Sequence, residues 1–281
     1  MLEGFFSSFT EHAQRAGITR LQFYVEQVGE QRLQVYEHEL ERLQLADVTL
    51  IYVEGEYAGK RGSTFVENLT PHLFNEHIAS IKQTAECSNT PFVPLSFHKL
   101  PALQTWDNGL PAFLLEEKLK AAEDAAYALD PRVKYVTECS CLKRTKRILL
   151  RDEWGNQMED KLHYYRMGVA VMAQDGGEVQ TARIADFVRN IDKLDMVNLA
   201  QTTAKRAVSM LHATPVPTGN YPVILHNNVV CELLLTFLPA FFADRVQNSM
   251  SRVGGKLGQQ VANSNVTLIE DPAFTLGIIT R

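Results

Sequence analysis

The clearest folding signal in the chain is residues 47–85, which read DVTLIYVEGEYAGKRGSTFVENLTPHLFNEHIASIKQTA. The first seven residues are mostly apolar, which is typical of a buried strand. Residues 54–61 contain two glycines and indicate a turn, after which residues 62–66 return as a second strand. Thr70 and Pro71 then begin a helix, because a hydroxyl N-cap precedes a proline at the first helical position. The stretch predicts a hairpin followed by a helix.

The residues before this stretch predict a helix and further strands. Apolar side chains recur at helical spacing until Gly17, at Leu2, Phe5, Phe6, Phe9, Ala13 and Ala16. Residues 21–25 alternate apolar and polar side chains, which is strand spacing, and residues 32–45 indicate a pair of strands. Residues 1–86 are therefore predicted to form an N-terminal α/β domain.

Prolines mark the next boundary, at residues 87–112, which we expect to be a linker. Residues 113–215 follow as a central α+β region. Its helix is predicted at residues 112–129, its strands lie over residues 133–182, and a second long helix spans residues 189–211.

The last part of the chain, residues 216–281, is predicted to be the incomplete start of a C-terminal domain. A short strand at residues 221–225 precedes a very apolar helix at residues 228–245, and a strand follows at residues 266–269. Helices alternate with antiparallel hairpins along the chain. The predicted fold class is therefore α+β, with mixed helices and largely antiparallel sheets in two domains that divide within residues 87–112.

Composition limits the class of protein. The 281 residues carry a net charge of -5, which gives no reason to expect direct contact with nucleic acid. A basic run at Lys143, Arg144, Lys146 and Arg147 fits an exposed sheet edge protected by charge better than a nucleic-acid patch. No run of eighteen apolar residues occurs, so we expect no membrane span.

The N-terminus and the cysteines favour a cytoplasmic protein. The opening residues, MLEGFFSSFTEHAQ, have no basic leader and do not resemble a signal peptide. Four cysteines are too few for a disulfide framework. Cys139 and Cys141 are two residues apart and would point to the same face of a strand, so we expect buried, reduced thiols rather than a metal site.

The order of several motifs is more informative than any one of them. Residues 47–85 are followed by a hairpin around Trp154, by QDGGEVQTA at residues 174–182, and by PVPTGNYPVIL at residues 215–225. The apolar helix, then GKLGQQVA and VTLIEDP, close the series. In this order the chain resembles the TldD/PmbA family over nearly its whole length.

The resemblance implies a zinc site in one kind of family member. TldD-like members resemble metallopeptidases with an H-E-x-x-x-H motif on the apolar helix and a further ligand nearer the C-terminus. When the family's acidic position is matched to Asp244, counting back from Gly258, the motif falls on Leu234, Leu235 and Pro239. A hydrocarbon side chain cannot bind zinc or act as a base. The chain is thus similar to the PmbA (TldE) member, which lacks the zinc motif.

Family members continue beyond the matched region, whereas this chain stops at Arg281. We therefore expect that the part with the third metal ligand is absent, through truncation at the C-terminus. On the resemblance, the chain is a non-catalytic subunit of a cytosolic TldD-type zinc metallopeptidase complex that acts in peptide proteolysis or maturation. Zinc is expected only in the TldD-like partner. The other expected partners are a peptide substrate and, as an alternative to the heteromer, a second copy of the chain.

Two other functions stay open. One is an active metallopeptidase with a non-standard metal site, for which His226, Cys231 and Glu232 are candidates near the start of the apolar helix. The other is a stand-alone peptide-binding or regulatory module, because strand-rich domains can bind extended peptides at a sheet edge.

The apolar helix also predicts an interface. Pro239 should interrupt it. We expect part of its apolar face to be exposed, and such a patch favours association with a partner. The residues of this predicted stripe are Phe237, Leu238, Phe241 and Phe242.

Overall fold

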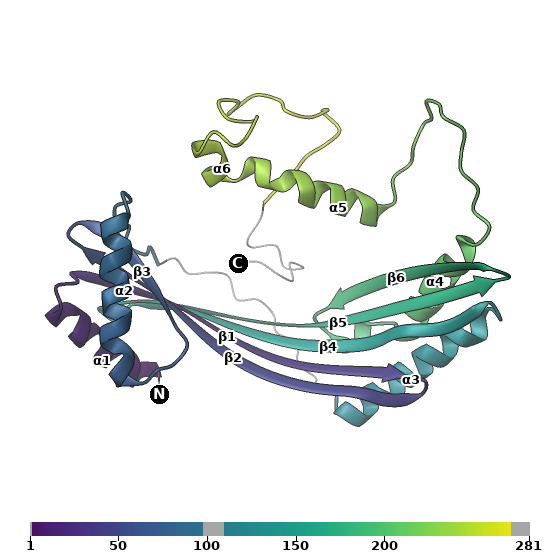
Figure 1. Cartoon of the computed structure of the whole chain (residues 1–281), viewed down its shortest axis with the longest axis horizontal. Helices are drawn as coiled ribbons and strands as arrows, with labels where there is room; N and C mark the ends of the chain where they lie inside the picture. The colour runs from purple at the N-terminus through teal and green to yellow at the C-terminus, as the bar shows by residue number, and fades with distance from the viewer. Residues whose placement is uncertain (1, 98–109, 271–281) are drawn as a thin grey trace. The chain divides into compact units, whose positions relative to one another are not determined.

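The computed structural model describes residues 2–97 and 110–270, and the contacts among them form two compact units. The first, here called the sheet unit, extends to Ala213, and the second, the C-terminal unit, begins at Thr214. Figure 1 shows the elements of each unit. Residues 98–109 of the predicted linker and residues 271–281 of the predicted C-terminal domain lie outside the described residues.

The sheet unit is built on one six-stranded sheet in the order β3-β2-β1-β4-β5-β6. Every pair of neighbours is antiparallel, which confirms the predicted α+β class with largely antiparallel sheets. The strands are β1 (Arg20–Tyr36), β2 (Glu39–Tyr57), β3 (Lys60–Val66), β4 (Val133–Asp152), β5 (Gln157–Asp175) and β6 (Glu178–Val188).

The centre of the sheet joins segments that are far apart in the sequence. Strand β1 pairs with β4 from Gln22 opposite Asp152 to Val35 opposite Cys139. Strands that precede and follow the predicted linker therefore share one sheet. The division into residues 1–86, 113–215 and 216–281 stays a prediction about domains, whereas the contacts group the first two segments in one unit.

Two helices cover one end of the sheet, on the left in Figure 1. They are α1 (Leu2–Arg15) and α2 (Phe74–Cys87), and the short helix η1 (Pro71–Leu73) precedes the second. Phenylalanine rings join them to β1, and the centroids of Phe6 and Phe23 are 5.0 Å apart. Burial of such side chains stabilises the fold by roughly 1.5–3 kcal/mol each. This cluster is therefore the main source of stability where α1 and α2 pack on the sheet.

Two other helices cover the opposite end. They are α3 (Ala112–Leu129) and α4 (Met196–Ser209), with η2 (Ile191–Lys193) before the second. Leu33, Val35, Cys139 and Cys141 are buried against them. The predicted helix at 112–129 is confirmed, and the helix predicted at 189–211 begins later, at Met196, because the side chain of Asp195 caps it by accepting a hydrogen bond from the Asn198 N–H.

Both helix pairs lie on the same face of the sheet. Phe23 and Val25 belong to the hydrophobic core under α1 and α2, and Leu33 and Val35 belong to the hydrophobic core under α3 and α4. All four residues have odd numbers in the regular part of β1. Side chains two residues apart in a strand share a face. The residues of β1 between the two cores, around Gln27 and Gly29, therefore form an uncovered stretch between the helix pairs.

The C-terminal unit consists of short helices and irregular chain. Its elements are α5 (Asn227–Phe237), η3 (Leu238–Phe241) and α6 (Ala243–Gln247). The predicted interruption at Pro239 is confirmed, since α5 ends two residues earlier. The strands predicted at 221–225 and 266–269 are wrong: neither segment is a strand, because within residues 214–270 neither has a neighbour to pair with. No described helix is long and apolar enough to cross a membrane.

Candidate functional site

The start of α5 is organised by His226. Its ring Nδ1 accepts a hydrogen bond from the Asn228 N–H at 3.3 Å, and thereby caps the helix. Cys231 and Glu232 follow in the first turns, and Cys231 is exposed. Across residues 2–97 and 110–270, no group of three His, Cys, Asp or Glu side chains could hold a metal. The structure thus does not gather the three candidates of the alternative zinc site, which stays a prediction from sequence.

The positions that the family resemblance assigns to the zinc motif lie on two different elements. Leu234 and Leu235 are in the last turn of α5, and Pro239 is in the 3-10 helix η3. All three side chains are hydrocarbon and offer no lone pair to a metal and no proton acceptor to a water molecule. These three positions therefore provide neither the metal ligands nor the base that a metal-activated hydrolysis needs.

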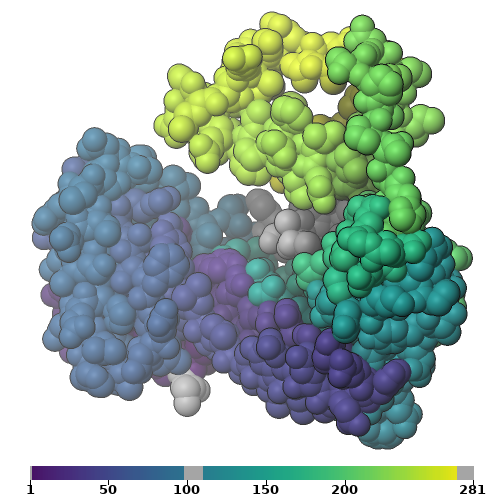
Figure 2. Space-filling model, turned by 45° about the vertical axis from the view of Figure 1, so that its right-hand side comes forward, coloured from purple at the N-terminus to yellow at the C-terminus, as the bar shows by residue number. Residues whose placement is uncertain are grey.

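The predicted interface stripe is open. The side chains of Phe237, Leu238, Phe241 and Phe242 are between 37% and 63% exposed. No described residue from 214 to 270 is buried, and the space-filling view shows open space between α5 and the loops of the same unit (Figure 2). An apolar surface of this kind is typical of a contact site for another protein segment.

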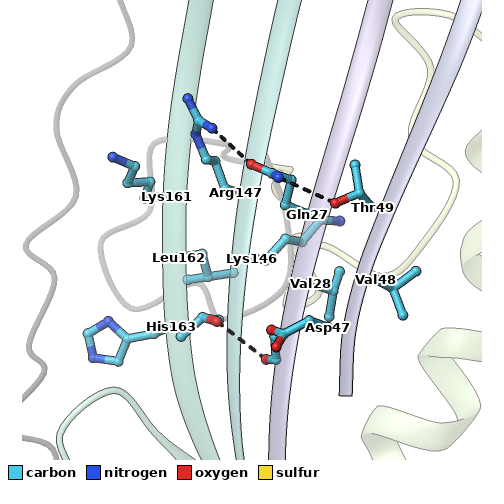
Figure 3. A pocket seen from close by; sticks show the side chains of 12 residues that line it. Gln27, Val28, Asp47, Val48, Thr49, Lys146, Arg147, Lys161, Leu162 and His163 are labelled. Atoms are coloured by element: carbon cyan, nitrogen blue, oxygen red, sulfur yellow. Dashed lines mark hydrogen bonds between the residues drawn. The ribbon is translucent and has the colours of Figure 1, made fainter. Parts of the chain in front are cut away.

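Sequence reasoning missed a second feature, a groove of about 590 Å³ on the helix-bearing face of the sheet (Figure 3). It lies on the stretch of the sheet between the two cores. Two rows of side chains form its floor, each with one residue from each of four strands. The first row is Thr49, Gln27, Arg147 and Lys161, and the second is Asp47, Gly29, Thr145 and His163.

Hydrogen bonds connect the first row across the sheet. Arg147 Nη1 donates to Gln27 Oε1 at 2.8 Å, and Gln27 Nε2 donates to Thr49 Oγ1 at 3.3 Å. Arg147 also holds Glu159 with two bonds of 2.9 Å, and the Lys161 ammonium lies 2.9 Å from the same carboxylate. These two cations lower the pKa of Glu159 to about 2. The charges of this row are therefore already paired.

The centre of the second row is a glycine, and its neighbours leave no space for a side chain at this position. A Cβ atom on Gly29 would lie 2.7 Å from Thr145 Oγ1 and 3.0 Å from Asp47 Oδ1. Thr145 Oγ1 donates to the Gly29 carbonyl oxygen at 3.3 Å. The floor thus offers hydroxyl, amide and carboxylate groups in a shallow grid. Such a surface suits hydrogen bonding to a polar chain, and it contains no arrangement of nucleophile and base.

The basic run at residues 143–147 does not lie at a sheet edge, so that expectation is wrong. Strand β4 has β1 on one side and β5 on the other along this run. Arg144 pairs with Glu30 at 3.1 Å, and Lys146 pairs with Glu26 at 3.0 Å. Local sequence shows the charges, but the pairing with a strand more than a hundred residues away decides that they lie in the middle of the sheet.

The buried thiols give a testable prediction. Burial raises the pKa of Cys139 and of Cys141 to about 12, and Cys139 Sγ donates to the Leu119 carbonyl oxygen at 3.4 Å. Only the thiolate reacts quickly. In the folded protein at pH 8, a chromogenic disulfide reagent should therefore label Cys87 and Cys231 within minutes and the other two only after unfolding. Rapid release of more than two equivalents would contradict this structure of the core.

Two family models match the chain. A model of the PmbA/TldA metallopeptidase central domain matches residues 110–211, and a model of the PmbA/TldA metallopeptidase C-terminal domain matches residues 218–281. Together the two matches cover more than half of the sequence.

Archaeal relatives match shorter parts. A metalloprotease of Methanothermobacter thermautotrophicus is 30% identical over 85 residues, which are 30% of this chain and 19% of that protein. A metalloprotease of Methanocaldococcus jannaschii is 30% identical over 129 residues, which are 45% of this chain and 28% of that protein. The matches thus span less than a third of either curated relative.

Solved structures share the fold over nearly the whole chain. A candidate modulator of DNA gyrase from Bacteroides thetaiotaomicron has a TM-score of 0.86 at 17% identity, with coverage of 99% of this chain and 66% of that one. A second candidate modulator of DNA gyrase, from Thermotoga maritima, has a TM-score of 0.79 at 20% identity, with coverage of 94% and 61%. TldE from Thermococcus kodakarensis has a TM-score of 0.64 at 16% identity, with coverage of 89% and 57%.

Proposed function

The chain belongs to the TldD/PmbA family of metallopeptidase-related proteins, and from this premise we propose that it is a non-catalytic, TldE-like subunit. Its partner is a TldD-type zinc metallopeptidase, and the complex acts on peptides in the cytoplasm. Zinc belongs to the partner, and this chain contributes contacts to the partner and to the peptide.

The observation that carries the proposal is the residue set at the positions of the zinc motif. Leu234, Leu235 and Pro239 replace two imidazoles and a carboxylate, so the two functions that a zinc peptidase needs, metal binding and activation of water, are both missing there. The break of the helix before Pro239 further separates the third position from the first two. These side chains can pack against other apolar groups, but they cannot bind a metal or activate water.

The exposed stripe supports a partner. Its four side chains would cost free energy if they stayed in water, and burial against another protein surface removes that cost. Because the stripe adjoins the motif positions in sequence, a subunit bound there lies next to the place where active relatives would hold zinc. The polar groove of the sheet unit supports a peptide ligand, since its amide, hydroxyl and carboxylate groups match the donors and acceptors of a peptide backbone.

A reconstitution experiment tests the proposal. The chain and a TldD-like subunit of the same source are expressed together, and association, zinc content and cleavage of an unfolded peptide are measured for the complex and for each chain alone. We expect one complex, with zinc on the TldD-like subunit and cleavage that requires that subunit. Stoichiometric zinc and peptidase activity in the isolated chain, abolished by His226→Ala with Cys231→Ser, would overturn the proposal in favour of a non-standard active site.

A stripe variant tests the interface within the same experiment. Replacement of Phe237 and Phe241 by aspartate should weaken the complex at least ten-fold, because two charges would be buried without partners. The matched control is Val216→Asp, which changes an exposed apolar side chain of the same unit outside the stripe. Equal affinity of the stripe variant and the control, or recovery of the chain without any TldD-like companion, would favour a stand-alone binding module.

A further inference from the structure

The two ends of the polar groove on the sheet unit carry opposite charges. Asp47 of β2 lies at one end, and Lys161 of β5 lies at the other (Figure 3). Among residues 2–97 and 110–270, the Asp47 carboxylate has no hydrogen-bond or ion-pair partner. At the opposite end, Arg147 and Lys161 share one carboxylate, that of Glu159, so one positive charge is in excess. The groove can therefore orient a ligand that is positive at one end and negative at the other.

Two oxygens converge at the negative end. A Cβ atom on Gly29 would lie 2.7 Å from Thr145 Oγ1 and 3.0 Å from Asp47 Oδ1, so both oxygens lie close to one point above the glycine. Thr145 Oγ1 donates its hydrogen to the Gly29 carbonyl oxygen at 3.3 Å, and its lone pairs remain for a donor. A hydroxyl oxygen beside a carboxylate can accept two hydrogen bonds from one ammonium group. This end of the groove therefore suits a primary ammonium group.

The positive end can receive a carboxylate. The Lys161 side chain is 66% exposed, and its ammonium group lies 2.9 Å from Glu159 Oε1. An ammonium group has three N–H donors, and this ion pair uses one of them. Arg147, in contrast, directs its donors to Glu159 and Gln27. Lys161 is therefore the group that can bind an additional carboxylate.

The floor between the two ends offers hydrogen bonds to a peptide backbone. Because a guanidinium group can only donate, the Gln27 amide must turn its oxygen to Arg147, and its nitrogen then donates to Thr49 Oγ1. One amide hydrogen of Gln27 and the hydroxyl hydrogen of Thr49 have no acceptor among the residues that the structure describes. Both hydrogens can be donated to carbonyl oxygens of a bound chain.

We propose that the polar groove binds a short peptide whose two ends are both free. The N-terminal ammonium group binds Asp47 and Thr145, the C-terminal carboxylate binds Lys161, and the chain between them crosses β1 and β4. This ligand rests on the proposed function, in which the groove receives a peptide, but it is narrower. It is a peptide of limited length with charged ends, and not an internal segment of a long chain.

The width of the sheet sets the length of this peptide. Asp47 and Lys161 are three strand spacings apart, which is roughly 14 Å, and they are offset by two residues along the strands, which is roughly 7 Å. The diagonal between them is about 16 Å. An extended chain covers at most about 3.3–3.6 Å per residue, so four or five residues connect the two ends. A dipeptide covers only about 7 Å and can reach one end alone.

Isothermal titration calorimetry of the full chain at low salt tests the proposal. Penta-alanine with free ends should bind about five-fold more tightly than its N-acetylated form, its C-amidated form or di-alanine. Asp47→Asn should weaken binding of the free peptide about five-fold and leave the acetylated peptide unchanged, and Lys161→Gln should do the same with respect to the amidated peptide. The matched controls are Glu39→Gln and Lys134→Gln, which remove exposed charges of β2 and β4 outside the groove. Circular dichroism verifies that each variant is folded.

A lysine side chain is the other source of an ammonium group, and one further peptide separates the two sources. Penta-alanine with both ends blocked and a central lysine should bind no better than the blocked peptide without lysine. The proposal is overturned if no peptide binds, if free and acetylated penta-alanine bind equally, or if the lysine peptide binds as tightly as the free one.

Assembly with a TldD-like subunit, measured on the same samples, separates this ligand from the proposed function. Intact assembly without end-dependent peptide binding would overturn only the ligand of the groove. Peptide binding as expected by a chain that does not assemble would support the ligand and contradict the proposed function.

Discussion

Gly62→Ala is expected to destabilise the sheet unit by about 3 kcal/mol, at the upper end of the usual cost of overpacking. Gly62 lies in β3, directly under α2. A Cβ atom there would be 1.8 Å from the Ile81 carbonyl oxygen and 3.0 Å from the Ala85 Cβ. Because the nearest atom belongs to the helix backbone, a side-chain rotation cannot relieve the clash, and α2 would have to move away from the sheet.

A second glycine lies at the same close contact between α2 and the sheet. Gly55 lies opposite Gly62 in β2, and a Cβ on Gly55 would be 2.8 Å from Ile18 Cγ2 and 3.0 Å from Ile81 Cγ2. Both glycines thus let Ile81 approach the strands.

Urea denaturation, followed by circular dichroism, measures the loss of stability at Gly62. The control is Gly4→Ala, which adds the same methyl group in α1, where no atom lies within 4 Å. Alanine in a helix should be more favourable than glycine there by roughly 0.5–1 kcal/mol. Equal urea midpoints for the two variants would show that α2 does not pack on the β2–β3 hairpin as closely as described.

Glu123→Ala is the second change with a large expected effect, also about 3 kcal/mol. The side chain of Glu123 is 0% exposed in α3, yet its two oxygens accept hydrogen bonds from the Glu37 N–H at 3.0 Å and the His38 N–H at 2.9 Å. Hydrogen bonds to a charged group contribute roughly 1.5–3 kcal/mol each, and alanine would leave both donors without an acceptor.

The two donors are in a strained turn, which adds to the role of Glu123. Glu37 has φ 50° and His38 has φ 63°, in the left-handed region that glycine and asparagine prefer in a two-residue hairpin. The carboxylate therefore holds a turn whose own sequence does not favour it. Hydrogen exchange at the amides of the β1–β2 hairpin should accelerate in the variant.

Two further variants sharpen the Glu123 experiment. Glu123→Gln keeps the shape and one acceptor oxygen, so its loss of stability should be intermediate. Glu117→Ala removes an exposed carboxylate from the same helix and should change the free energy of unfolding by less than about 0.5 kcal/mol. If Glu123→Ala lowered the free energy of unfolding as little as Glu117→Ala, the two hydrogen bonds that Glu123 accepts from the hairpin would contribute no stability.

Local sequence predicted the elements whose signals are local. Helix α3 occupies residues 112–129 as expected, because apolar spacing within it coincides with Pro111 before it and Asp130-Pro131 after it. The β4–β5 and β5–β6 turns contain Gly155 and Gly176, which have φ values of 91° and 59° in the structure. These positions need a left-handed backbone, so glycine identifies them without knowledge of the rest of the chain.

Elements that depend on a distant partner were predicted less well. Residues 221–225 and 266–269 have the composition of strands but form none, since a strand is stable only beside another strand. The basic run in β4 was assigned to an edge because its neighbour β1 is more than a hundred residues away. The polar groove was missed for the same reason, since its floor combines single residues from four strands.

What the sequence by itself determined is the chemistry available at each position. Hydrocarbon side chains at Leu234, Leu235 and Pro239 exclude metal binding there in any conformation, because the donor atoms do not exist. Only the tertiary structure decided which distant groups meet: Gly62 under the backbone of Ile81, and Glu123 beneath the turn of a hairpin 85 residues earlier. The physical reason is that bond-forming capacity belongs to a residue, whereas burial and proximity belong to the packing of the whole sheet unit.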